Sequence, residues 1–98
     1  MKVFISQPMR DKSNEEILLE RKQMIEKVNE IATEKPEVID SFFENAPAEA
    51  KPLWFLGKSL ELLSTADVAV FAKGWEDARG CRIEHECCVQ YGIKTIEM

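Results

Sequence analysis

The chain has 98 residues, of which 45% are hydrophobic and 32% charged, and this composition is typical of one globular domain spanning residues 1–98. Its formal net charge of −5 argues against a nucleic-acid polymer or an anionic membrane as the main partner. No apolar run approaches the length of a transmembrane helix, and the first residues turn polar too soon for a signal peptide. The three cysteines are odd in number and crowded into residues 81–88, which does not suit a disulfide framework. We therefore expect a protein of the reducing cytoplasm.

The first part of the chain carries a strand pattern followed by a helix pattern. Lys2–Ser6 is a β-branched and aromatic run that predicts a buried central strand. Ser13 and Glu16 have the spacing of a capping box, so a helix should begin there. Apolar residues at helical spacing predict its core stripe: Ile17, Met24, Val28 and Ile31. Pro36 should end this helix.

Strand and helix patterns continue to alternate after Pro36. Residues 38–43 predict a weaker second strand, and residues 44–51 a loop that is mobile or folds over the site. Pro52 suits the first position of a helix, with an apolar seam formed by Leu53, Leu56, Leu60 and Leu63. Residues 67–72 and 94–97 predict strands. Residues 80–91 between them predict a helix, with its core stripe at Ile83, Cys87 and Tyr91.

Four strands alternating with three helices predict an α/β three-layer sandwich of the Rossmann or flavodoxin type. We expect a four-stranded parallel sheet in the order 2-1-3-4, with helices on both faces. The loops at residues 6–10 and 73–79 should then meet at the carboxyl edge of the sheet, where the strand order reverses. Open α/β sheets bind their ligands at this switch point.

Glu84 is the acidic residue that this arrangement favours. The predicted helix places it in the first turn, where the positive end of the helix dipole stabilises a carboxylate. A glutamate in this position is also common as a purely structural partner of the dipole.

The order of the motifs resembles the nucleoside 2-deoxyribosyltransferase superfamily, which includes deoxynucleoside-monophosphate N-glycosidases. The resemblance rests on the strand at residues 67–71, on Gly80-x-x-x-Glu84 and on Gly92-Ile93-Lys94. The chain is most similar to a small single-domain branch of unassigned function. Two motifs carry that similarity: Ile5-Ser6-Gln7-Pro8-Met9 and Gly74-Trp75-Glu76-Asp77.

The resemblance implies a small-molecule nucleoside or nucleotide ligand and no cofactor. It makes Glu84 the nucleophile that forms a covalent glycosyl-enzyme intermediate when the bond between base and sugar breaks. The loop after the first strand is implied to hold the sugar or its 5′ end, through Ser6, Gln7, Pro8, Met9 and Arg10. Trp75 is implied to stack on a base, with Gly74 and Gly80 shaping the second loop.

One position departs from the superfamily pattern. The second acidic residue of the superfamily falls on Ser59 here, and a hydroxyl cannot supply a proton at neutral pH. Asp77 is the candidate to replace it as a catalytic acid. The alternative is a non-catalytic nucleotide-binding or regulatory module that uses the same site.

Two further features complete the predictions. Cys81, His85 and Cys88 share one helix face and suit zinc, but without a fourth ligand we favour no metal. In that interpretation Cys87 lies in the core, Cys88 is half-buried and His85 is on the outer face. Apolar surface on the last helix and at Trp54 and Phe55 predicts a homodimer or larger homo-oligomer.

Overall fold

The central feature of the structure is a parallel sheet with helices on both faces. The computed structural model describes residues 1–41 and 46–98. Within these residues the elements are β1 (Lys2–Ser6), α1 (Asn14–Ile31), β2 (Glu37–Val38), α2 (Pro52–Leu63), β3 (Val68–Phe71), the 3₁₀ turn η1 (Trp75–Asp77), α3 (Arg79–Tyr91) and β4 (Lys94–Glu97). The strands pair in parallel in the order β2-β1-β3-β4. The predicted α/β architecture of flavodoxin type is therefore confirmed.

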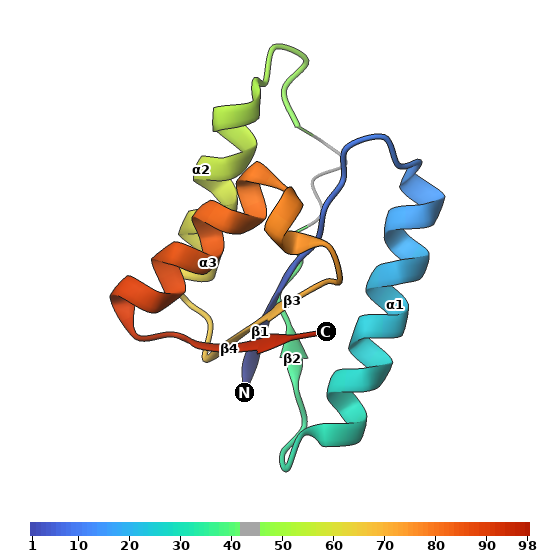
Figure 1. Cartoon of the computed structure of the whole chain (residues 1–98), viewed down its shortest axis with the longest axis vertical. Coiled ribbons are helices and arrows are strands. Elements are labelled where there is room, and N and C mark those ends of the chain that lie inside the picture. The colour runs from blue at the N-terminus through green and yellow to red at the C-terminus, as the bar shows by residue number, and fades with distance from the viewer. Residues whose placement is uncertain (42–45) are drawn as a thin grey trace.

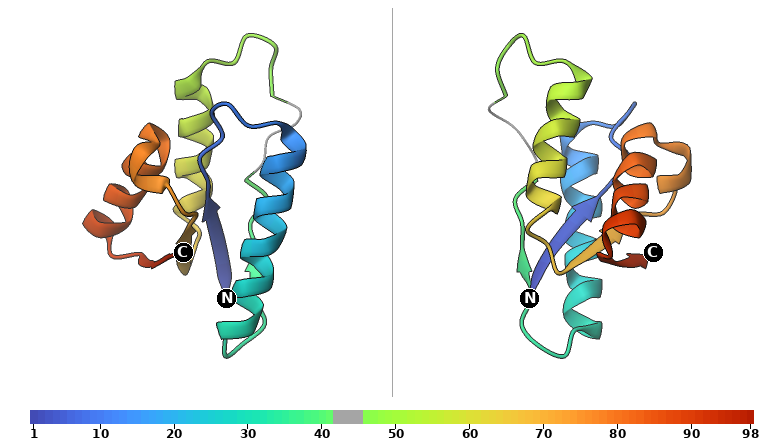
Figure 2. Two further views of the ribbon diagram at one scale, coloured as in Figure 1. Left: turned by 45° about the vertical axis from the view of Figure 1, so that its right-hand side comes forward. Right: turned by 90° about the vertical axis from the view of Figure 1, so that its left-hand side faces the viewer.

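Two apolar layers hold the helices against the sheet. In Figures 1 and 2, α1 covers one face, and α2 and α3 lie side by side on the other. Successive residues of a strand point to opposite faces. Val3 and Ile5 therefore pack with Met24 in one layer, and Phe4 packs with Leu63 in the other. Burying each such side chain contributes about 1.5–3 kcal/mol.

Helix α1 begins as predicted but ends earlier. Ser13 accepts a hydrogen bond from the Glu16 backbone N–H at 3.1 Å, within a complete capping box. The prediction that Pro36 ends the helix is wrong, because Ala32 already has extended backbone angles and caps the helix after Ile31. Ile31 is consequently 54% exposed and lies outside the core stripe.

The second strand and the loop after it differ from the prediction. Strand β2 contains only Glu37–Val38, although the backbone N–H of Ile39 still donates to the Val3 carbonyl at 2.9 Å. Residues 39–41 of the predicted strand are not part of a strand, and residues 42 and 43 lie outside the described residues, as do residues 44 and 45 of the predicted mobile loop. Residues 46–51 contain no helix or strand.

The predicted core stripes of the last two helices are wrong in part. In α2 only Leu63 of the proposed seam is buried, and Leu53 is 78% exposed. In α3 the buried residues are Cys81, Glu84 and Cys88. Because successive helical residues are about 100° apart, the predicted stripe at Ile83, Cys87 and Tyr91 lies beside the face that is buried. A search for apolar spacing missed this face because a glutamate occupies its centre.

Two residues that the sequence places on one stripe of α1 should differ sharply in their effect on stability. Met24 is 5% exposed and Ile31 is 54% exposed. We predict that Met24→Ala lowers the free energy of unfolding by about 2–5 kcal/mol, because it leaves a cavity in the core. Ile31→Ala should change it by no more than about 0.5 kcal/mol. Urea denaturation of both variants measures the two free energies of unfolding. Equal losses in the two variants would contradict the burial of Met24 and the exposure of Ile31.

Candidate functional site

Three elements bring polar side chains together around Glu84. Ser6 is the last residue of β1, and its hydroxyl donates a hydrogen bond of 2.6 Å to Glu84 Oε1 in a buried environment. Ser59, on α2, interacts with the same carboxylate and lowers its pKa. Ser6 and Glu84 are only 2% and 7% exposed. We refer to Ser6, Ser59 and Glu84 as the Glu84 site.

The topology of the sheet places this site at its carboxyl edge. Ser6 is paired in register with Phe71, so β1 and β3 end at the same level. The chain leaves β3 through η1 and enters α3, which returns over the sheet. The predicted position of Glu84 beside the loop after β1 is therefore correct.

The predicted role of the helix dipole at Glu84 is wrong. Helix α3 begins at Arg79, so Glu84 is its sixth residue and lies beyond the first turn. The effect of the helix dipole falls off within that turn. The hydroxyl groups of Ser6 and Ser59 stabilise the carboxylate instead.

Burial dominates the electrostatics of Glu84. Loss of solvent raises the pKa of its carboxyl group above the ordinary value of 4.5. The hydrogen bond from Ser6 and the interaction with Ser59 partly oppose this shift in pKa. Among the described residues, no lysine, arginine or histidine forms an ion pair with Glu84. A buried carboxylate held only by neutral hydroxyl groups has an unusual and costly environment.

The cysteines around Glu84 do not form a reactive or metal-binding group. Burial raises the pKa of the Cys81 and Cys88 thiols to about 11 in each case, so both are protonated at neutral pH. Cys88 is fully buried and Cys87 only half-buried, the reverse of the prediction. Within residues 1–41 and 46–98 no three His, Cys, Asp or Glu side chains are arranged to hold a metal ion.

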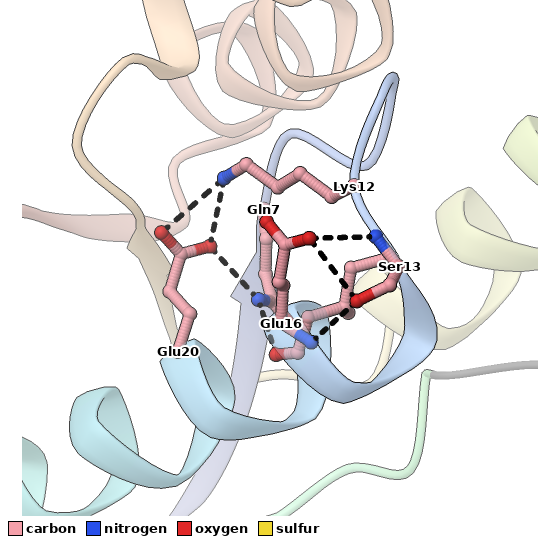
Figure 3. Close-up of polar contacts among 6 residues, drawn as sticks. Gln7, Lys12, Ser13, Glu16 and Glu20 are labelled. Carbon is pink, nitrogen blue, oxygen red and sulfur yellow. Dashed lines mark hydrogen bonds and ion pairs between the residues drawn. The ribbon is translucent and has the colours of Figure 1, made fainter.

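Gln7 belongs to the scaffold beneath the loop that follows β1. Its side-chain amide donates to the Ile17 carbonyl at 3.1 Å and to Glu20 Oε1 at 3.0 Å. Figure 3 shows that Lys12 reaches the same Glu20 carboxylate from the other end of the loop, at 3.4 Å. This network ties the loop to α1 and occupies the Gln7 side chain that the sequence suggested for ligand binding.

Arg21 is a residue that sequence analysis missed. It is 7% exposed, and its guanidinium donates to Gln7 Oε1, to the Ile39 carbonyl and to the Ser41 hydroxyl. Burial lowers its pKa, an effect that the charge of Asp40 opposes. A signal was available, because Arg21 lies four residues after Ile17 and three before Met24, on the buried stripe of α1.

The remaining residues of the first loop face outwards. Pro8 is half-buried, whereas Met9 and Arg10 are exposed. The loop turns back where the Lys12 backbone N–H donates to the Met9 carbonyl, with Asp11 in the left-handed region at a φ of 64°. Met9 and Arg10 are thus placed to meet a ligand arriving from solvent.

The second loop contains Gly74, Trp75 and Asp77. Gly74 has a φ of 89°, which favours glycine, and it leads into η1. Asp77 is exposed, and no hydrogen bond within the described residues connects it to the Glu84 site. Gly80 is the second residue of α3. The predicted outer position of His85 is wrong, because its ring is stacked on Trp75 at a centroid distance of 4.1 Å.

The opposite, amino-terminal edge of the sheet has a hollow of about 250 Å³. It is lined mainly by apolar side chains at the end of α1 and at the beginnings of β3 and β4, together with Asp67 and Lys94. None of its lining residues belongs to the Glu84 site.

Comparisons of the chain with protein-family models, curated proteins and solved structures find no match. The resemblance to the deoxyribosyltransferase superfamily therefore stays a prediction from motifs. None of the helices within the described residues has the length and apolar character needed to cross a membrane.

The raised pKa of Glu84 predicts a specific dependence of stability on pH. A carboxyl group whose pKa is higher in the folded protein than in the unfolded chain stabilises the fold at pH values below its ordinary pKa of 4.5. This contribution is lost as pH rises through the pKa of the folded protein. Glu84→Gln cannot ionise, so the variant should gain stability relative to the wild type as pH rises from 4 to 7. Urea denaturation across this range measures the difference.

The matched control for this experiment is Glu86→Gln. Glu86 is exposed on the same helix, and within the described part of the chain its carboxylate accepts a hydrogen bond from Gln90 alone, at 3.2 Å. This control should leave the pH dependence caused by Glu84 in place. A difference in the free energy of unfolding between wild type and Glu84→Gln that does not change with pH would contradict the buried environment assigned to Glu84.

Proposed function

We propose that the Glu84 site binds a nucleoside or nucleotide and that Glu84 acts on its N-glycosidic bond, by hydrolysis or by transfer to another base. The observation that carries this proposal is the buried carboxylate of Glu84, which accepts a hydrogen bond from Ser6 and has no cationic partner within the described residues. Its position at the carboxyl edge of a parallel sheet supports the proposal, because ligands of such folds bind there. The motif resemblance supplies the ligand class.

A purely structural role does not explain this environment well. Burying a carboxylate is expensive, and structural carboxylates offset the expense through an ion pair or several backbone N–H groups. Glu84 has neither among the described residues. Groups whose burial is costly and whose pKa is shifted occur preferentially at functional sites.

The proposed chemistry uses the two oxygens of Glu84 differently. Ser6 holds Oε1 at 2.6 Å and so fixes the orientation of the carboxylate. A carboxylate oxygen forms a bond to the anomeric carbon as the bond from that carbon to the base nitrogen breaks. The base leaves with the bonding electrons and takes a proton from water. Water, or a second base, then bonds to the anomeric carbon as the bond from that carbon to Glu84 breaks, and the proton that it loses returns to solvent.

The alternative function is a binding or regulatory module that leaves the glycosidic bond intact. Ser59 favours this alternative, because it occupies the position where the superfamily has an acid. Its hydroxyl interacts with the Glu84 carboxylate instead. Asp77, the other candidate acid, is exposed, and among the described residues no hydrogen bond connects it to the Glu84 site. In this alternative the same ligand binds without being cleaved.

Release of free base from deoxynucleosides and their 5′-monophosphates tests the enzymatic function. We predict release by the wild type and a reduction of about 10³-fold or more in Glu84→Gln, because the amide keeps the shape but is no nucleophile. Ligand binding, measured by calorimetry, should persist in this variant. Glu86→Gln, which makes the same charge change at an exposed position, should retain activity.

Ser59→Asp separates the two functions. It introduces a carboxyl group where the superfamily has its acid, beside a second carboxylate that raises the pKa of the pair. If proton donation limits catalysis, base release should increase in this variant. If wild type and Ser59→Asp both bind a nucleotide and neither releases base, the binding module is correct. Failure of both to bind would contradict both functions.

We also propose that the protein forms a homodimer or larger homo-oligomer through α2 and the outer face of α3. Leu63 is the only buried residue of α2, and Leu53, Val89 and Tyr91 are 78%, 62% and 82% exposed. The two charged residues of α2, Lys58 and Glu61, lie 3.6 Å apart and form an ion pair with each other. A second copy of the same weakly charged surface is a fitting partner for it.

Light scattering after size-exclusion chromatography tests the oligomer. We predict a mass of at least two chains for the wild type at micromolar concentration, and dissociation in Leu53→Lys and Tyr91→Lys. The control is Leu19→Lys, which is 59% exposed on α1, across the sheet. A monomeric wild type would contradict the proposal.

The free thiols support the cytoplasmic location that we propose for the protein. All three cysteines are unpaired, and Cys81 and Cys88 are buried. Disulfides are rare in the reducing cytoplasm.

A further inference from the structure

In the loop between β3 and α3, the side chain of Trp75 packs against aromatic residues of the rest of the fold. The Trp75, Asp77 and Ala78 backbone N–H groups donate only to carbonyls within four residues of themselves, at 3.1 Å in each case. Gly74 has no side chain, and Glu76 and Asp77 are exposed. Arg82 on α3 donates to the Glu76 carbonyl at 3.4 Å, and the ring of Trp75 supplies the aromatic contacts between this loop and the rest of the fold.

His85 provides the surface against which Trp75 packs. The two rings are nearly parallel, with centroids 4.1 Å apart and an angle of 13° between their planes. Phe71 contacts both at an angle, with its centroid 5.5 Å from Trp75 and 4.8 Å from His85. These contacts join the end of β3, the loop and α3 in one aromatic group.

Glu97 fixes the His85 ring in turn. His85 Nε2 lies 2.7 Å from Glu97 Oε1, and the carboxylate is at the end of β4. The His85 side chain is only 18% exposed, and that of Glu97 is 52% exposed. Because Glu97 accepts from Nε2 and Phe71 contacts the ring from the sheet, the imidazole cannot turn away from Trp75 without losing both contacts.

We propose that His85 is a positioning residue: its ring holds Trp75, and thereby the loop at residues 74–78, against the turn of α3 that carries Glu84. His85 directly follows Glu84 on α3, so the same helical turn carries the proposed nucleophile and the support of the loop. The significance for ligand binding rests on the proposed function, whereas the hold on the loop does not. His85 thus has a role other than the metal ligation that its cysteine neighbours suggest.

The test compares two substitutions of His85 in a Trp54→Phe background, where Trp75 is the one tryptophan left of two. His85→Leu removes the stacked ring, and His85→Phe restores a ring that lacks the bond to Glu97. Leu19→Ala, on α1 across the sheet and 59% exposed, is the control. The readouts are acrylamide quenching of Trp75 fluorescence and hydrogen exchange at the backbone amides of residues 75–78.

We expect His85→Leu to increase both quenching and exchange by about threefold to tenfold, the factor that loss of one aromatic pair produces. His85→Phe should recover most of the protection, and Leu19→Ala should match the background. Equal protection in His85→Leu and the background would overturn the proposal. Equal loss in His85→Phe and His85→Leu would also overturn it, because the ring would then not be the supporting group.

Binding of a deoxynucleoside 5′-monophosphate separates this proposal from the proposed function. If both are correct, His85→Leu should weaken binding by about threefold to tenfold, in step with the change in exchange, and His85→Phe should restore it. If the wild type binds no nucleotide, the proposed function fails, and the fluorescence and exchange results still decide the role of His85. Weaker binding with unchanged exchange would contradict the positioning role.

Discussion

The hydrogen bond between Ser6 and Glu84 joins the first strand to the last helix, 78 residues apart in the chain. A buried carboxylate requires such partners, because water is not there to solvate it. Three features of the fold bring these partners to Glu84. Strand β1 ends level with β3, and α2 brings Ser59 to the same edge of the sheet. Helix α3 begins at Arg79, so that its sixth residue, Glu84, faces the sheet. A shift of one residue in the register between β1 and β3 would turn Ser6 to the opposite face.

A second buried polar group, Arg21, anchors the loop after β1. Arg21 links α1 to Gln7 and to the segment after β2 through three hydrogen bonds, at 3.4, 2.8 and 3.1 Å. Ser6 and Gln7 are adjacent, so what holds Gln7 also limits the movement of Ser6. The two faces of the sheet thus have different tasks at this edge. The α1 side anchors the loop, and the α2 and α3 side provides the carboxylate.

The sequence predicted the architecture well because burial on both faces leaves a strong pattern in strands such as Lys2–Ser6. Strand order and the level at which β1 and β3 end together followed from the alternation of elements and the handedness of their connections. The sequence also predicted that Glu84 faces the loop after β1. Apolar periodicity failed where buried positions hold polar residues, as at Arg21 in α1 and Glu84 in α3, because the counterparts that satisfy them are distant in the chain. The stack of Trp75 on His85 likewise depends on how a loop folds back, which local spacing does not encode.

The central place of β1 has a consequence for how the chain acquires its structure during synthesis. Val3 pairs with Val68, which is made 65 residues later. At about 5–20 residues per second, a ribosome takes roughly 3–13 s to supply that partner. Until then the apolar core of β1 has only α1 and the two-residue strand β2 to cover it, and its open edge is a template for other extended chains. The nascent protein thus passes through a period of exposure to aggregation, in which an attached chaperone protects it most.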